Sequence, residues 1–334
     1  MRLLTIAITS FSRVSELERC IKSIDTKYIN KVEIVVSEDC SPKKREITKL
    51  VTNLTKKIPY QVNFNSNNHN LGYDKNIKKL IDLSNSEYIL FITDDDVFRA
   101  KSLDKIIYFL ENNKPSFLLT PFFHEKHKNN QRKYYKSHIV NCGIESIKKY
   151  IFDSILVSGL IFKKSLLPEY DVNKFHKLIY SQVYLFSYLL YRYDGFYLDD
   201  VLIDCIEDGE NAYGISKNNI NEKLADRTKP ISNLEFNKGL IKIIRIFDND
   251  HNESLHRKFS FEYSLRSWTG LYESRKISQK EMNNFFKELI KLDVSFQYIS
   301  YIYFIFLTLF GYKIAGNIFS LPRNIFFKLR KKVN

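Results

Sequence analysis

The chain has 334 residues, of which 44% are hydrophobic and 27% are charged, and its formal net charge is +14 at pH 7. This length allows one large core with an appendage, and the composition is that of a globular protein. The four cysteines, at positions 20, 40, 142 and 205, are too scattered for a zinc pair or a disulfide framework, which favours a reducing compartment.

Strands and helices alternate over the first part of the chain. Apolar runs rich in β-branched residues predict strands, and apolar residues at helical spacing predict the helices between them. The predicted strands are 3–10, 32–36, 61–64 and 88–93, and the predicted helices are 12–24 and 74–83. The first run breaks at Thr9-Ser10 and reads as a strand rather than a signal peptide, so we expect a cytoplasmic protein. The alternation implies a mostly parallel, doubly wound α/β sheet.

Carboxylates stand directly after two of these strands. Asp94, Asp95 and Asp96 follow the fourth strand, and Glu38 and Asp39 follow the second. Ligands of open α/β sheets collect beyond the carboxyl ends of the strands, and neighbouring carboxylates repel one another unless a cation lies between them. The pattern therefore suggests a divalent metal and a phosphate-bearing ligand. An acidic turn, or a helix N-terminus that favours negative charge, is the alternative.

The chain resembles family 2 of the glycosyltransferases, whose members have the nucleotide-binding GT-A fold. The matching pieces are the opening 4–13, the turn Glu38-Asp39-Cys40-Ser41, Asn70-Leu71-Gly72 with Asn76 behind it, and Asp94-Asp95-Asp96. Their order and spacing over roughly the first hundred residues carry the resemblance. It implies an α/β fold of GT-A type, with a mostly parallel twisted sheet flanked by helices.

The resemblance also implies an activity. The expected enzyme is metal-dependent and inverting, and it moves a sugar from a nucleoside-diphosphate sugar, with a UDP-sugar favoured, to a glycan or lipid-linked saccharide in assembly of surface polysaccharide such as O-antigen. Mn²⁺ or Mg²⁺ held by hard oxygen ligands would stabilise the departing diphosphate as a Lewis acid. Two alternatives stay open: a nucleotidyltransferase acting on sugar phosphates, which would normally show a glycine-rich phosphate loop, and a catalytically inactive sugar-nucleotide-binding or membrane scaffold.

Site residues follow from the resemblance by position. Those expected to hold the nucleotide sugar in this half of the chain are Ser10, Phe11, Glu38, Asp39, Lys75, Asp94 and Asp95, and Glu38 stands where the family usually has Asp. Asp96 is the expected direct metal ligand, whereas Asp94 is the expected ribose contact and second metal ligand. Lys75 would meet phosphate as a point charge, with an exposed helix lysine as the alternative.

The next segment is expected to serve the acceptor. A strand is predicted at 156–162, and its Ser158 and Gly159 resemble the point where family members approach the donor sugar. The alternative is an ordinary strand whose glycine allows close packing. Many family members continue with a helix that opens with Glu-Asp, whose Asp is the base. The helix predicted at 180–193 lacks that acidic pair, so Asp171 and His176 just upstream are the candidates for the base, with surface or capping roles as the alternative.

The remaining chain turns polar and then helical. We expect a strand at 201–206, an acidic loop at 207–214 that suits a lid, and helices at 255–272 and 279–292. These patterns predict a catalytic domain at 1–215, with a donor half at about 1–100 and an acceptor half at 101–215. Residues 216–334 then form a helical C-terminal appendage.

The end of the chain is basic and apolar. No acid follows Asp293, and Lys313, Arg323, Lys328, Arg330, Lys331 and Lys332 accumulate among Ile, Phe and Leu. Such a tail is typical of a segment that lies on an anionic membrane surface, and no nucleic-acid-binding motif accompanies the charge. Residues 294–312 carry no formal charge and are long enough to span a bilayer, but polar residues interrupt them. We expect a helical hairpin on the catalytic domain or in the interface, and a peripheral enzyme on the cytoplasmic face.

Overall fold

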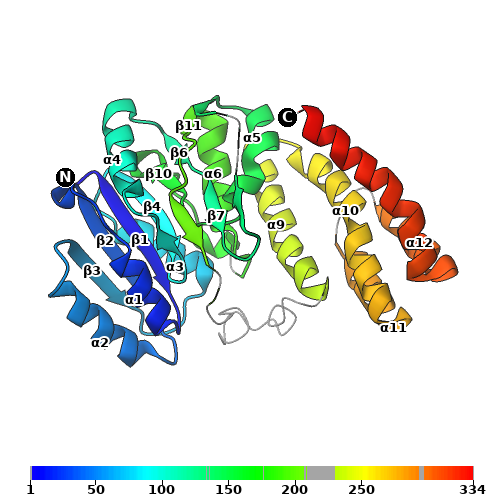
Figure 1. The fold of residues 1–334 in the computed structure, drawn as a ribbon, viewed down its shortest axis with the longest axis horizontal. Helices are drawn as coiled ribbons and strands as arrows, with labels where there is room; N and C mark the ends of the chain where they lie inside the picture. Colours follow the sequence, from blue (N-terminus) through cyan, green and yellow to red (C-terminus); the bar gives the residue numbers. More distant parts are fainter. Residues whose placement is uncertain are drawn as a thin grey trace. The chain divides into compact units, whose positions relative to one another are not determined.

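A computed structural model describes residues 2–132, 134, 136–175, 177–206, 208, 230–292 and 297–333, except for the side chains of 232, 233, 235, 317 and 319–333. The chain divides into two compact units, Met1–Ile220 and Asn221–Asn334. The first is an α/β unit and the second is helical (Figure 1).

The first unit is built on a mixed sheet with four parallel strands along one side. The strand order is β3 (Gln61–Ser66), β2 (Val32–Glu38), β1 (Leu4–Ser10), β4 (Tyr88–Thr93), β10 (Ile161–Lys163), β6 (Phe117–Leu119), β11 (Gly195–Tyr197) and β9 (His138–Val140). The first four are parallel to one another, and β10 runs antiparallel to both of its neighbours. The predicted sheet and its first four strands are confirmed.

Helices cover both faces of this sheet because strand side chains alternate between the faces. One face carries Leu4, Ile6 and Ile8 of β1 and shares a core with α1 (Val14–Lys22), α2 (Lys44–Thr55) and α4 (Ser102–Asn113). On the other face α3 (Tyr73–Leu83) packs on β1 and β2. Phe186 of α6 (Ser181–Arg192) lies against Phe162 of β10, and α5 (Ile144–Tyr150) packs beside α6.

A second sheet of four short strands lies in the same unit. Its order is β5 (Val97–Phe98), β12 (Ile203–Cys205), β7 (Phe122–His124) and β8 (Asn129–Gln131). The strand predicted at 201–206 therefore belongs to this sheet. The strand predicted at 156–162 is shorter and forms only β10. Before it, the carbonyls of Leu156 and Ser158 accept hydrogen bonds from the buried Arg132 side chain.

Short 3₁₀ helices complete the first unit. They are η1 (Ile29–Lys31), η2 (Ile151–Ser154), η3 (Lys164–Leu166) and η4 (Val172–Phe175).

The second unit consists of α9 (Pro230–His251), α10 (Leu255–Ile277), α11 (Gln279–Leu289) and α12 (Gln297–Val333), as far as it is described. α10 contacts each of the other three helices, and Trp268, Leu271 and Phe285 lie in their shared core. α12 is kinked at Gly311, whose φ is 66°. Its segment Gln297–Gly316 is long and apolar enough to cross a membrane by length and composition. The predicted helical C-terminal region is confirmed.

Candidate active site

Four chain segments meet at one edge of the large sheet. The carboxyl ends of β1, β2 and β4 lie there because these strands are parallel, and the segment entering β10 joins them because β10 is antiparallel. The Asp39 N–H donates to the Ser10 carbonyl at 3.0 Å, and the Phe11 N–H donates to Oδ2 of Asp94 at 3.0 Å. The Thr93 N–H donates to Oγ of Ser158 at 3.1 Å. The structure thus brings these predicted site residues together.

The aspartate run is buried. Asp94, Asp95 and Asp96 are 3%, 8% and 1% exposed. Nη1 of Arg13 lies 2.9 Å from Oδ1 of Asp94 and 3.0 Å from Oδ2 of Asp95. Burial raises the pKa of Asp94 to about 7, although the Arg13 charge opposes the rise. The site therefore holds its negative charge at a cost in solvation that a bound cation would relieve.

Asp96 has different partners from its two neighbours. Its Oδ2 accepts a hydrogen bond from the Thr93 hydroxyl at 2.9 Å, and its Oδ1 accepts one from the Ile206 N–H at 3.2 Å. Burial, followed by the charge of Asp95, raises the pKa of Asp96 to about 6. Ser158, also fully buried, shares the Thr93 hydroxyl with Asp96.

These carboxylates suit a cation that is shared with a ligand. Within the described residues no group of three or more His, Cys, Asp or Glu side chains converges on a metal position. Asp94 and Asp96 nevertheless supply hard oxygens, and Mg²⁺ in nucleotide sites is usually held by one or two carboxylates together with phosphates and water. The donor set therefore fits a cation held jointly with a diphosphate.

The turn after β2 is held by its own acids. Oδ1 of Asp39 accepts from the Leu71 N–H at 2.7 Å and Oδ2 accepts from the Gly72 N–H at 2.9 Å. Glu38 accepts from the N–H groups of Cys40 at 3.0 Å and Ser41 at 2.7 Å. Asp39 thus fixes the asparagine-rich loop before α3, while Glu38 fixes its own turn.

Ser10 offers a hydroxyl for a ligand at this edge. It is 2% exposed, and its Oγ has no hydrogen-bond partner among the residues that the structure describes. Buried hydroxyls are normally paired, so an unpaired one at the end of β1 fits a nucleotide contact. Lys75 lies half-buried in the first turn of α3.

An acid that was not predicted lies at the start of α6. Oδ2 of Asp74 accepts from the Ile179 N–H at 2.9 Å, and Oδ1 accepts from the Ser181 N–H at 3.0 Å. Burial raises the pKa of Asp74 to about 6. The helix itself opens with Ser181 and Gln182, and the carboxylate that caps its start comes from α3. Only the position of Asp74 between Gly72 and Asn76 could have drawn attention to it.

Among the described residues, neither of the two candidates for the base takes part in these contacts. Asp171 is exposed, and its Oδ1 accepts from the N–H and the side-chain amide of Asn173, both at 2.9 Å, so it caps the turn at η4. His176 lies outside the described residues. The predicted lid at 207–214 also lies outside them except for Asp208, which pairs with Arg19 of α1 at 2.7 Å.

Arg132, which was not predicted, and the predicted Gly159 shape the segment before β10. Arg132 is buried, and its Nη1 donates to the Ser158 carbonyl at 3.0 Å. Burial lowers the pKa of Arg132 to about 10, so it stays charged at neutral pH. Gly159 has φ +81°, a conformation that favours glycine. A Cβ at this position would lie 3.5 Å from the nearest side-chain atoms, which is ordinary contact, so the backbone conformation is what favours glycine here. Cys20 of α1 is buried on the sheet, and its Sγ lies 3.8 Å from the Thr93 carbonyl.

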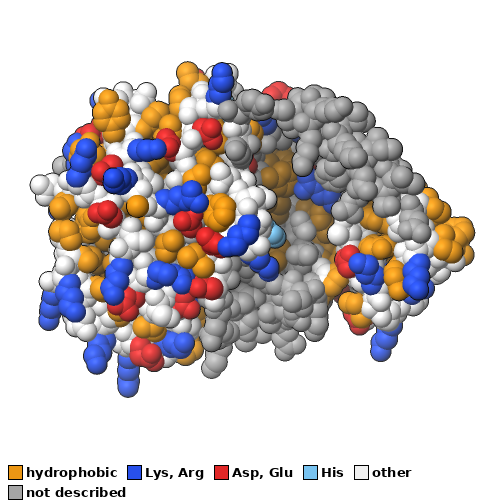
Figure 2. All heavy atoms as spheres, in the orientation of Figure 1, with side chains coloured by type: hydrophobic (Ala, Val, Ile, Leu, Met, Phe, Trp, Pro, Cys, Tyr) orange, Lys and Arg blue, Asp and Glu red, His pale blue; other side chains and the backbone are white. Residues whose placement is uncertain are grey.

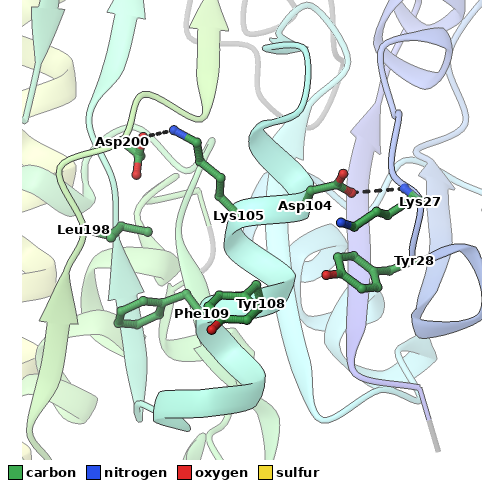
Figure 3. Close-up of a pocket in the computed structure, with 8 residues that line it drawn as sticks. All are labelled: Lys27, Tyr28, Asp104, Lys105, Tyr108, Phe109, Leu198 and Asp200. Atoms are coloured by element: carbon green, nitrogen blue, oxygen red, sulfur yellow. Dashed lines mark hydrogen bonds and ion pairs between the residues drawn. The ribbon is translucent and has the colours of Figure 1, made fainter.

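A pocket of about 390 Å³ lies elsewhere in the first unit (Figure 3). Aromatic side chains of Tyr28, Tyr108 and Phe109 line its lower part in this view, and charged residues lie above them. Lys105 pairs with Asp200 at 2.5 Å, and Oδ1 of Asp104 accepts from the Lys27 N–H at 3.0 Å. Its lining includes none of the predicted site residues.

Comparisons with known proteins show what the first unit is similar to. The sequence profile of glycosyl transferase family 2 matches residues 5–169. The chain is 26% identical over 201 residues to the GalNAc(5)-diNAcBac-PP-undecaprenol beta-1,3-glucosyltransferase of Campylobacter jejuni, covering 58% of this chain and 62% of that protein. It is 23% identical over 111 residues to an uncharacterized glycosyltransferase of Haemophilus influenzae, covering 33% of this chain and 35% of that protein. The chain thus matches less than two thirds of the length of either relative.

Solved structures share the fold at low identity. The mannosyltransferase PcManGT from Pyrobaculum calidifontis, in complex with GDP-Man and Mn²⁺, has a TM-score of 0.53 and 11% identity, over 96% of this chain and 88% of that one. S. aureus TarS 1–349 in complex with UDP-GlcNAc has a TM-score of 0.50 and 14% identity, over 84% of this chain and 83% of that one. The likeness concerns the fold, which is of GT-A type. Through residues 5–169, whose strand ends carry the aspartate run, the chain belongs to glycosyl transferase family 2.

Proposed function

We propose that the chain is a glycosyltransferase that moves a sugar from a nucleoside-diphosphate sugar, with a UDP-sugar favoured, to a glycan or lipid-linked saccharide. The observation that carries the proposal is the buried aspartate run beside the ends of β1 and β2, with the unpaired Ser10 hydroxyl at the same edge. The relatives support the substrate classes, since one is named for a lipid-linked saccharide and two solved neighbours hold nucleotide sugars. The proposed catalytic part is 1–215.

Each proposed site residue would contact a different part of the donor or the metal ion. Ser10, Phe11 and Asp39 would hold the base and ribose, and Ser158 and Gly159 would line the sugar. Asp96 and Asp94 would hold Mn²⁺ or Mg²⁺, which would supply Lewis-acid stabilisation of the diphosphate. Arg132 keeps the segment before β10 in place from beneath. An acceptor hydroxyl attacking opposite the diphosphate would invert the anomeric centre, and Asp171 and His176 stay the predicted bases.

A peripheral position on the cytoplasmic face of a membrane completes the proposal. Hydrophobic side chains gather at the end of the helical unit where α12 begins, whereas charges of both signs are mixed over the α/β unit (Figure 2). Tyr298, Ile302, Ile305 and Leu309 are more than half exposed and follow one another at helical spacing. The opposite side of α12 packs on α10 and α11, with Phe304 stacked on Phe286 at 4.0 Å between ring centroids. A helix packed in this way suits the membrane interface, and the basic tail would strengthen it on anionic lipid.

Calorimetry tests the sugar-donor site. UDP and GDP are titrated with and without Mn²⁺ into the full chain and into Asp96→Ala. We expect Mn²⁺-dependent binding of UDP that falls at least roughly tenfold in the variant, because a charge-assisted metal contact is lost. Asp82→Ala is the matched control, since Asp82 is an exposed acid of α3 that pairs with Lys78.

The outcomes separate the alternatives. Tight UDP binding that ignores both Mn²⁺ and Asp96 would contradict the metal assignment. Binding without hydrolysis or transfer of the sugar from any UDP- or GDP-sugar would favour an inactive scaffold. This outcome is worth testing because α6 begins with Ser181 and has no acid in its first turn.

A further inference from the structure

The turn between β1 and α1 carries a cation into the aspartate run. One guanidinium nitrogen of Arg13 bridges Asp94 and Asp95, at 2.9 Å from Oδ1 of the first and 3.0 Å from Oδ2 of the second. A nitrogen in this position neutralises two neighbouring carboxylates that would otherwise repel each other. Asp94 is also one of the two residues proposed to hold the metal ion, so Arg13 and the metal would compete for it.

The turn is built to hold the guanidinium there. Ser12 has φ 62°, a left-handed conformation that non-glycine residues rarely adopt, and it directs the chain from the end of β1 back toward the acids. The preceding Phe11 N–H donates to the other oxygen of Asp94 at 3.0 Å. Both oxygens of Asp94 are therefore bonded by the same turn, and the Arg13 side chain is only 12% exposed.

Asp96 is left outside this arrangement. Its oxygens accept from the Thr93 hydroxyl and the Ile206 N–H, which are neutral donors. Within the described residues, the ion pairs of the aspartate run reach Asp94 and Asp95 and none reaches Asp96. Among the residues that the structure describes, Asp94 and Asp95 therefore share one guanidinium, whereas Asp96 accepts from neutral donors.

We propose that Arg13 pairs with Asp94 and Asp95 before substrate binds, and that it leaves Asp94 for the diphosphate when a nucleotide brings in a divalent cation. The inference rests on the proposed function. A guanidinium and a divalent cation repel each other and cannot share the carboxylates, whereas a guanidinium pairs well with phosphate oxygens. Arg13 thus weakens the binding of free metal to the empty protein and strengthens the binding of a nucleoside diphosphate.

Two binding measurements on Arg13→Gln test the exchange. Free Mn²⁺ is followed by electron paramagnetic resonance during titration of the protein alone, and UDP binding in EDTA is measured by calorimetry. The variant should bind Mn²⁺ roughly tenfold more tightly and UDP roughly tenfold more weakly than the natural chain, because one charge is removed from both contacts. Arg13→Lys keeps the charge and should stay close to the natural chain for Mn²⁺.

The control removes a positive charge from the far end of α1, the helix that follows Arg13. Lys22 is 61% exposed and pairs with Glu18 at 2.6 Å, so Lys22→Gln should change neither constant by more than about twofold. Should Arg13→Gln fail to fold, judged by circular dichroism, Arg13→Met retains the apolar stem of the side chain and takes its place.

Opposite shifts of the two constants support the exchange. If the natural chain binds Mn²⁺ with UDP but Arg13→Gln leaves its Mn²⁺ affinity unchanged or lower, the exchange is refuted while the proposed function stands. If neither chain binds Mn²⁺ or UDP, both the exchange and the proposed function fail.

Discussion

At the scale of single residues, burial gives the site its charge properties. The pKa values of Asp94 and Asp96 rise to about 7 and about 6 because both carboxylates are removed from water. An unfolded aspartate has a pKa of about 4. The folded chain therefore holds protons on these residues at a pH where the unfolded chain has lost them, and its stability falls as the pH rises through that interval.

Asp96→Asn should separate stability from binding. The asparagine keeps an oxygen for the Ile206 N–H and turns an amide toward the Thr93 hydroxyl, and it removes the buried charge. Without nucleotide, the variant should be more stable than the natural chain at pH 8 by on the order of 2 kcal/mol, and the difference should shrink toward zero near pH 4. Denaturant titrations at both pH values measure it.

The same variant should lose its Mn²⁺-dependent binding of UDP. A variant that is less stable than the natural chain at pH 8 would show that the hydrogen bonds of Asp96 outweigh the cost of its charge. Substitutions that stabilise a protein often weaken its function when the site is destabilised by buried charges that the ligand needs.

At the scale of elements, one carboxylate links α3 to α6. Asp74 satisfies two N–H groups at the start of α6, which would otherwise lack partners within the helix. The two elements are more than 100 residues apart in the chain. The position of α6 therefore depends on α3, whose own start is fixed by Asp39 through Gly72.

Asp74→Asn should weaken this link. At pH 4 the cost of the buried Asp74 charge no longer enters, and the asparagine has one acceptor oxygen for two N–H groups and points its amide toward the other. We therefore expect a loss of about 1–2 kcal/mol at that pH and a melting temperature lower by several degrees. Differential scanning fluorimetry measures the shift. Asp82→Asn on the same helix is exposed and should change it little. Equal shifts in both variants would contradict a capping role for Asp74.

The elements also show what a sequence can predict. The strands at β1 and β4 follow from their unbroken apolar runs, and the aspartates after β4 follow from its abrupt end. By contrast, α2 was not predicted, although its buried Ile47, Val51 and Leu54 follow one another at helical spacing. The hydrogen bond from Arg132 to Ser158 spans 26 residues, and the pairing of Arg13 with Asp94 spans 81 residues. Contacts at such separations leave no local pattern.

At the scale of the whole molecule, the two units expose different surfaces. The α/β unit keeps its large apolar side chains inside with few exceptions, whereas α12 presents several to solvent. The described part of α12 carries no Asp or Glu, so its exposed side has no negative charge that anionic lipid would repel. Exposed apolar patches of this kind usually mark an interaction site.

Leu309→Asp should reduce binding to vesicles that contain anionic lipid. Leu309 is 71% exposed, and a buried carboxylate in the interface costs solvation energy, so we expect at least a roughly fivefold loss in co-sedimentation. Ile277→Asp is the matched control, because Ile277 is 62% exposed at the end of α10 and outside the exposed row of α12. Equal losses in both variants, or none in Leu309→Asp, would contradict a membrane role for this row.

The reactivity of the Cys20 thiol reports local opening at the active-site edge. It is sealed between α1 and β4 under the aspartate run, and burial, followed by the nearby aspartate charges, raises its pKa well above the ordinary value. A thiol in this state reacts slowly, because the thiolate is the nucleophile and no reagent reaches it while α1 is in place. The rate at which Cys20 is alkylated therefore reports how often α1 opens from the sheet. A ligand that contacts both the aspartate run and the turn before α1 would lower this rate.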